Sequence, residues 1–226
     1  RWWHRLGSVT HRTGPHLRDK PKKMMKSLLY SALLVGGSVY AQQHLQVSAN
    51  KLFQEISREE YDIQLLYYTD KAVQGESVKE VLENAQHVLA QLLEEIPENK
   101  IQYSYRIGKW SVGQVLQHLI SYEKIMTERA LIIAGEITGD YQYQVYTQSS
   151  TAAGGRNKTK SQLIEAFLET RKNTIDVFNK LSDEQLLAIG RLDGFKTSVR
   201  MISLCISGHQ THHFQVLKDR YKVFEE

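Results

Sequence analysis

The stretch SVRMISLCISGHQTHHFQVL, residues 198–217, decides the fold. Its apolar residues recur every three or four positions, which predicts an amphipathic helix. At about 100° per residue, a stripe about 100° wide holds Ile202, Ile206, Val216 and Leu217. His209 and His213 fall in the middle of this stripe, one turn apart, and His212 lies on its flank. The sequence therefore predicts a helix that turns two imidazoles toward the core.

The same periodicity recurs in three further segments, residues 77–97, 110–135 and 160–181, and the last helix extends to about residue 224. Ser77 and Ser111 are the predicted N-caps of the first two segments. No segment shows the alternation of a strand, and no repeat has a fixed period. The fold class that follows is all-α, with the helices packed as a four-helix bundle.

The predicted domain organisation places this bundle in residues 66–226. Residues 136–158 read as a long loop, and Ser182 caps a short helical piece that stops at Gly190. The structure of residues 42–65 is not clear from their pattern. A composition of 41% hydrophobic and 24% charged residues is typical of a globular chain and excludes disorder throughout.

The net charge of +4 comes from one end of the chain. Residues 1–26 hold eight basic side chains and one acid, whereas the other 200 residues hold 21 basic and 24 acidic ones. The body is thus mildly acidic and has no basic stripe with interleaved aromatic residues, so we expect no nucleic-acid partner.

The basic segment leads into a short apolar one. Residues 27–41 carry no charge, are too short to span a membrane, and end in Val39-Tyr40-Ala41. This order is typical of a cleavable signal peptide, here residues 24–41 with Met24 or Met25 as its start, and a buried core helix is the alternative. Residues 1–23 then read as an upstream extension that is not native. We expect an exported protein, periplasmic or extracellular, with no stable membrane insertion after cleavage.

The two core histidines indicate a metal site. Histidines at i and i+4 on a helix can direct two nitrogens to one ion, although a pair of hydrogen-bonded core histidines would give the same pattern. His118, at the edge of the buried stripe of residues 110–135, is the best candidate for a third ligand. Three histidines would leave one coordination position open, as catalytic zinc sites do.

Several motifs resemble the DinB-like (damage-inducible) superfamily, in the order the family has them. They are Gly108-Lys109-Trp110-Ser111-Val112, His118-Leu119-Ile120-Ser121-Tyr122-Glu123, Arg129-Ala130-Leu131, Glu165-Ala166-Phe167-Leu168-Glu169-Thr170-Arg171, Ser198-Val199-Arg200, Gly208-His209-Gln210-Thr211-His212-His213 and Arg220-Tyr221. The resemblance implies a four-helix bundle that holds a divalent metal, zinc or nickel, on His118, His209 and His213. Many relatives have an acid where this chain has Ser121.

The resemblance also implies a function. We expect a metal-dependent hydrolase that acts on a small-molecule substrate through metal-activated water, with His212, Tyr122 and Glu123 as acid–base or supporting groups. The alternatives are a metal-dependent thiol transferase and a non-catalytic metal-binding or stress-response protein. Thiol transfer needs a small cytosolic thiol, so export argues against it. A homodimer is also consistent with the resemblance.

Overall fold

The computed structural model describes residues 51–138, 151–192 and 194–225. The chain divides into two units, residues 1–40 and 41–226, and every described residue belongs to the second. The predicted upstream extension, the predicted signal peptide and most of the predicted loop at residues 136–158 lie outside the described residues.

Four long helices form the body of the second unit, as the periodicity predicts. They are α4 (Val78–Glu95), α5 (Val112–Ile133), α7 (Lys160–Phe178) and α9 (Val199–Asp219). Each begins at a serine or threonine whose side chain accepts a backbone N–H of the first turn, namely Ser77, Ser111, Thr159 and Ser198. These caps satisfy N–H groups that would otherwise lack partners, which fixes where each helix starts.

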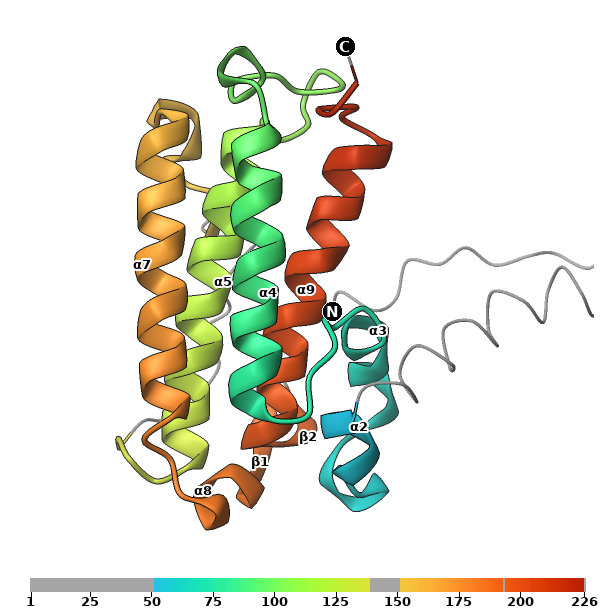
Figure 1. Cartoon of the computed structure of the whole chain (residues 1–226), viewed down its shortest axis with the longest axis vertical. Coiled ribbons are helices and arrows are strands. Elements are labelled where there is room, and N and C mark those ends of the chain that lie inside the picture. Colours follow the sequence, from blue (N-terminus) through green and yellow to red (C-terminus); the bar gives the residue numbers. More distant parts are fainter. Residues whose placement is uncertain (1–50, 139–150, 193, 226) are drawn as a thin grey trace, which may run out of the picture. The chain divides into compact units, whose positions relative to one another are not determined.

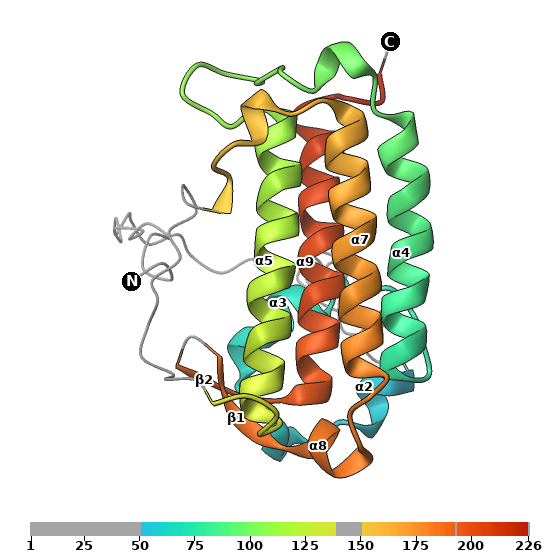
Figure 2. The same ribbon diagram turned by 90° about the vertical axis from the view of Figure 1, so that its left-hand side faces the viewer.

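The four helices pack as a bundle whose order in space differs from their order in the sequence (Figures 1 and 2). Helix α5 packs against α7 and α9, and α4 packs against the same two helices. The α5–α9 face and the α4–α7 face therefore lie on opposite sides of the bundle. Helices α5 and α7 run in the same direction, and α4 and α9 run in the opposite one (Figure 1).

Shorter elements close one end and one side of the bundle. The segment before α4 contains α2 (Lys51–Glu55), η1 (Arg58–Glu60), η2 (Ile63–Leu65) and α3 (Leu66–Thr69), and the connections contain η3 (Glu98–Lys100), η4 (Gly155–Asn157) and α8 (Asp183–Leu187). Helix α8 begins at Ser182, as predicted. Helix α3 packs against α9, so the start of the predicted bundle domain, ahead of its first long helix, covers α9, the helix that carries His209 and His213.

The prediction of a purely helical fold misses one element. Strands β1 (Ile189–Leu192) and β2 (Phe195–Ser198) form an antiparallel hairpin just before α9, in which Ile189 pairs with Ser198. Each strand has only four residues, too few for an alternating pattern to emerge from the sequence. Among the described residues, this is the only sheet.

The close approach of α3 to α9 depends on a glycine. A Cβ added to Gly208 would lie 1.8 Å from the carbonyl oxygen of Tyr68, so only glycine allows the two backbones to come this close. This contact brings the tyrosine beside His209, the next residue of α9. Among the described helices, none is long and apolar enough to cross a membrane.

Candidate metal centre

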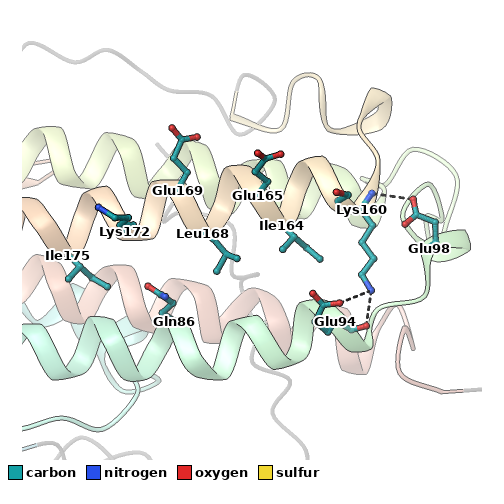
Figure 3. A pocket seen from close by; sticks show the side chains of 11 residues that line it. Gln86, Glu94, Glu98, Lys160, Ile164, Glu165, Leu168, Glu169, Lys172 and Ile175 are labelled. Atoms are coloured by element: carbon teal, nitrogen blue, oxygen red, sulfur yellow. Dashed lines mark hydrogen bonds and ion pairs between the residues drawn. The ribbon is translucent and has the colours of Figure 1, made fainter.

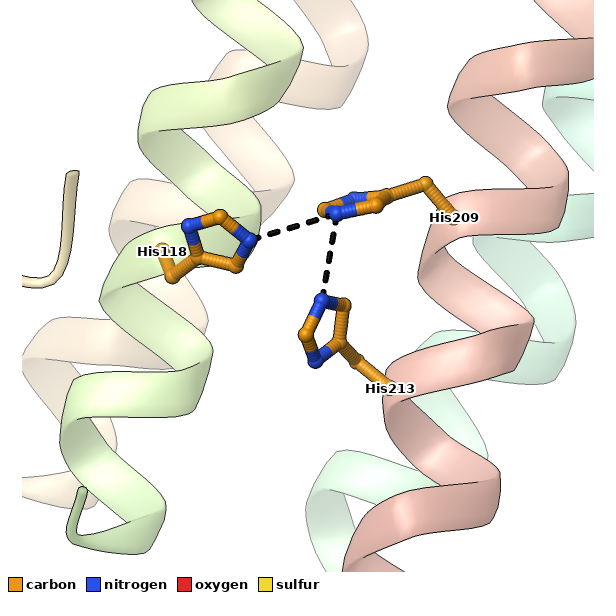
Figure 4. Close-up of side chains that lie close together, drawn as sticks. All are labelled: His118, His209 and His213. Atoms are coloured by element: carbon orange, nitrogen blue, oxygen red, sulfur yellow. Dashed lines mark hydrogen bonds between the residues drawn. The ribbon is translucent and has the colours of Figure 1, made fainter. Parts of the chain in front are cut away.

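Three histidine side chains converge between α5 and α9 (Figure 4). His118 comes from α5, and His209 and His213 come from successive turns of α9. The Nε2 atom of His209 lies 3.2 Å from Nε2 of His118 and 3.1 Å from Nε2 of His213. All three side chains offer a ligand atom within 4.8 Å of the others. The structure thus brings together the three residues that the sequence nominates as metal ligands.

The two separations from Nε2 of His209 are close to those in a tetrahedral metal site. Tetrahedral Zn²⁺ with Zn–N bonds of about 2.0–2.1 Å separates two ligand nitrogens by about 3.3 Å. Without an ion, Nε2 of His209 would have to form hydrogen bonds with the Nε2 atoms of both His118 and His213. It has only one in-plane proton or lone pair for this, since a neutral imidazole carries one proton and one lone pair on its two nitrogens. A cation shared by three lone pairs resolves this conflict.

Burial keeps the cluster in the form that binds metals. It lowers the pKa of His118 to about 4. Burial also lowers the pKa of His209 and of His213 well below the usual value, and the neighbouring imidazoles lower both further. The three rings are therefore neutral at pH 7, and a neutral imidazole has the lone pair that a metal needs.

More than half of the chain matches a known protein family. The model of the DinB superfamily matches residues 81–217, which include all three histidines. The chain belongs to the DinB superfamily. The structure of YfiT from Bacillus subtilis, described as a probable metal-dependent hydrolase with an unusual four-helix bundle topology, is 21% identical, with a TM-score of 0.46, and the match covers 75% of this chain and 91% of that one. No curated protein matches.

Aromatic rings surround the histidines of this DinB superfamily protein. Tyr122 stacks on the ring of His209, with ring centroids 3.7 Å apart and planes inclined by 23°. Tyr68 meets the same imidazole edge-on at 5.1 Å, and Trp110 lies 5.2 Å from the ring of His118. These rings limit the rotation of the imidazoles and keep water from most of the cluster. His213 is the most exposed of the three, so the cluster opens on its side.

Of the predicted acid–base residues, His212 lies nearest the open side. Its ring is 5.1 Å from that of His213 and also touches Tyr67 and Tyr68 edge-on. Burial lowers its pKa, and the charges of Lys71 and Arg220 lower it further. A proton-transfer role for His212 stays a prediction that its position allows.

Glu123, another of the predicted acid–base residues, is paired with Arg171 in the bundle core. Both of its carboxylate oxygens accept hydrogen bonds from Arg171, and both side chains are buried. The contacts that the structure gives Glu123 thus hold the bundle core together, and its acid–base role stays a prediction.

Sequence reasoning missed two residues next to the site. Thr151 lies after the predicted loop's centre, and its Oγ1 is 2.6 Å from Nδ1 of His118. Tyr68 reaches the cluster only through the packing of α3 on α9. Neither has a sequence signal, because each contact joins segments that the periodicity of one helix cannot relate.

A groove lies away from the histidines. It has a volume of about 950 Å³ and runs between α4 and α7, on the opposite side of the bundle from the α5–α9 face (Figure 3). Ile164, Leu168 and Ile175 line it. At one end, Nζ of Lys160 lies 3.8 Å from Oε2 of Glu94, and the backbone N–H of Lys160 donates to Oε1 of Glu98. With no histidine on its walls, this groove is not part of the candidate metal centre.

Proposed function

We propose that this protein binds one divalent metal ion through His118, His209 and His213 and hydrolyses a small-molecule substrate. One observation carries the proposal: three Nε2 atoms from two helices converge in a buried, aromatic site, at separations of 3.1 and 3.2 Å. Such an ion, when bound, would supply Lewis-acid activation of water or of a substrate oxygen.

The residues around the cluster would have different roles in such a site. The rings of Tyr122 and Tyr68 hold His209 in place from two sides. The partly exposed His213 marks the side from which a substrate would approach. His212, next to it, is the side chain best placed to exchange a proton with a bound substrate.

Zinc and nickel are the metals we propose, because both accept imidazole ligands. Export of the protein is also part of the proposal, and its support is the basic and apolar order of residues 1–41. An exported enzyme has water but no cytosolic thiol at hand, which favours hydrolysis over thiol transfer.

The test measures bound metal in protein that has been loaded with Zn²⁺ or Ni²⁺ and then desalted. We expect about one ion per chain in the wild type and a large loss in His118→Ala and His213→Ala. His87→Ala is the matched control, since His87 lies exposed on α4 outside the cluster. Equal metal content in all four proteins would show that the three histidines are not the site.

Activity screens on the loaded protein then separate the alternatives. Turnover of simple esters or amides that is lost in His213→Ala supports hydrolysis. Turnover that needs an added thiol supports the transferase, and metal binding with neither activity supports a non-catalytic role.

A further inference from the structure

A buried threonine occupies the far side of one proposed metal ligand. Oγ1 of Thr151 lies 2.6 Å from Nδ1 of His118, and each residue is at most 6% exposed. The other ring nitrogen of His118, Nε2, faces His209. The imidazole is therefore held at both nitrogens, by a hydroxyl on one side and by the histidine cluster on the other.

The segment that carries Thr151 is fixed against the start of α5. A Cβ on Gly155 would lie 2.4 Å from the carbonyl oxygen of Gly113, and a Cβ on Gly113 would lie 2.6 Å from that of Gly155. Only a pair of glycines permits this approach. Lys158 adds a second attachment, since its Nζ donates to Oε1 of Gln117 at 2.7 Å. Both contacts come from residues that follow Thr151 and meet α5 just before His118, so they hold the segment that presents the hydroxyl.

The two tautomers of His118 have opposite consequences for metal binding. With the proton on Nδ1, the ring donates to the threonine hydroxyl, and the lone pair of Nε2 faces the cluster. With the proton on Nε2, the threonine hydroxyl would donate to Nδ1 instead, but an N–H would point at Nε2 of His209, which already has His213 at 3.1 Å. In this second form, a proton would occupy the space between the three nitrogens, where a metal ion needs three lone pairs.

We infer that Thr151 is a positioning residue for the metal centre: its hydroxyl accepts a hydrogen bond from Nδ1 of His118 and, together with the crowding at Nε2, stabilises the tautomer whose Nε2 can bind a metal. Partners of this kind orient metal-binding histidines and raise their basicity. The inference rests on the proposed metal site, but its first consequence, the tautomer, exists in the metal-free protein.

Two measurements test this role. The first is the tautomer of His118 in metal-free wild-type protein, read from the ¹⁵N chemical shifts of its ring. We expect a proton on Nδ1 in the wild type and in Thr151→Ser, and a mixture of tautomers in Thr151→Val, which keeps the shape of the side chain and removes the hydroxyl. A proton on Nε2 in the wild type would overturn the inference.

The second measurement is the Zn²⁺ dissociation constant of the same proteins. We expect Thr151→Val to weaken binding by about 10- to 100-fold and Thr151→Ser to restore most of it. Thr127→Val is the control, because Thr127 is buried on the same helix as His118 but bonds to the backbone of Glu123 and to Thr174. Wild-type affinity in Thr151→Val would contradict the inference. If the wild type itself binds no Zn²⁺, the proposed function fails, and the tautomer measurement alone decides the role of Thr151.

Discussion

Arg171 donates two hydrogen bonds to the carboxylate of Glu123, 2.6 Å from Nε to Oε1 and 2.9 Å from Nη2 to Oε2. The same guanidinium donates to Oε1 of Gln210 at 2.6 Å and to the carbonyl oxygen of Leu82 at 3.2 Å. Gln210 in turn donates to the carbonyl oxygen of Ala85. One buried cation therefore joins all four long helices, and Gln210 is the neighbour of His209 in α9.

Breaking the Arg171–Glu123 pair should lower the stability of the fold rather than change the activity. Arg171→Met leaves an unpaired carboxylate in the core, and loss of one partner of a buried ion pair costs about 3–5 kcal/mol. We expect a large drop in the free energy of unfolding by urea. Lys172→Met, which breaks the exposed Lys172–Asp176 pair on the same helix, should leave the urea midpoint almost unchanged.

The double variant Arg171→Met/Glu123→Leu separates a structural role from a catalytic one. Because it removes both charges, it should be less destabilised than Arg171→Met alone. If Glu123→Gln instead keeps wild-type stability and loses turnover, the acid–base role predicted from the sequence is correct and the structural one is wrong.

The stacked pair of Tyr122 and His209 gives a second prediction. Tyr122→Phe keeps the ring over the imidazole and should bind Zn²⁺ as the wild type does. Tyr122→Ala removes the stack, and an aromatic pair contributes about 0.5–1.5 kcal/mol beyond the area it buries, so we expect affinity to fall by roughly 2- to 10-fold. Calorimetric titration of the three proteins measures this. Loss of turnover in Tyr122→Phe, with metal binding intact, would show that the hydroxyl takes part in the reaction.

The helices and two of the three clustered histidines follow from local patterns. Ser77, Ser111 and Ser182 cap helices where the sequence predicts them, and the helical wheel of α9 places His209 and His213 in its apolar stripe. These features depend only on residues within one helix. The β1–β2 hairpin is too short for such a signal.

The sequence also contains a pattern that indicates the buried ion pair. Arg171 stands four residues after Phe167 on α7, and Glu123 stands four after Leu119 on α5, so each charge lies on an apolar stripe. Opposite charges on two core stripes predict a pair. The contact of Thr151 with His118 had no comparable pattern, because it depends on how a connection between helices folds back on α5.

A pH dependence of stability should come from Glu60 and Arg200. Burial alone would raise the pKa of Glu60, but hydrogen bonds from Arg200, from the backbone of Ser57 and from Ser198 together lower it. A carboxyl whose pKa is lower in the folded state stabilises the fold above its unfolded pKa, about 4.3, and this stabilisation is lost as the pH falls through the folded pKa.

Unfolding by urea at pH 6, 5, 4 and 3 tests this pair. Between pH 6 and pH 3 the wild type should lose more stability than Glu60→Gln, which has no proton to gain. Glu59→Gln is the control, since the Glu59 side chain in the same short helix is exposed, and it should follow the wild type. Parallel curves for the wild type and Glu60→Gln would show that the pair does not contribute.

Gly208→Ala tests whether the packing of α3 shapes the metal centre. In an isolated helix this change should stabilise α9, since alanine is favoured over glycine by about 0.5–1 kcal/mol. Here the new Cβ would lie 1.8 Å from a backbone oxygen of Tyr68, which no rotamer change can relieve, so α3 must move away from α9. We expect a net destabilisation of about 1–3 kcal/mol, as overpacking of a core produces, and a looser contact between Tyr68 and His209. Ser203→Ala, a buried change five residues earlier in α9 that adds no atom, serves as the control and should cost about 1 kcal/mol or less. Urea unfolding measures the stability and the Zn²⁺ dissociation constant measures the site; a Gly208→Ala protein more stable than the wild type would mean that α3 does not pack on α9 in solution.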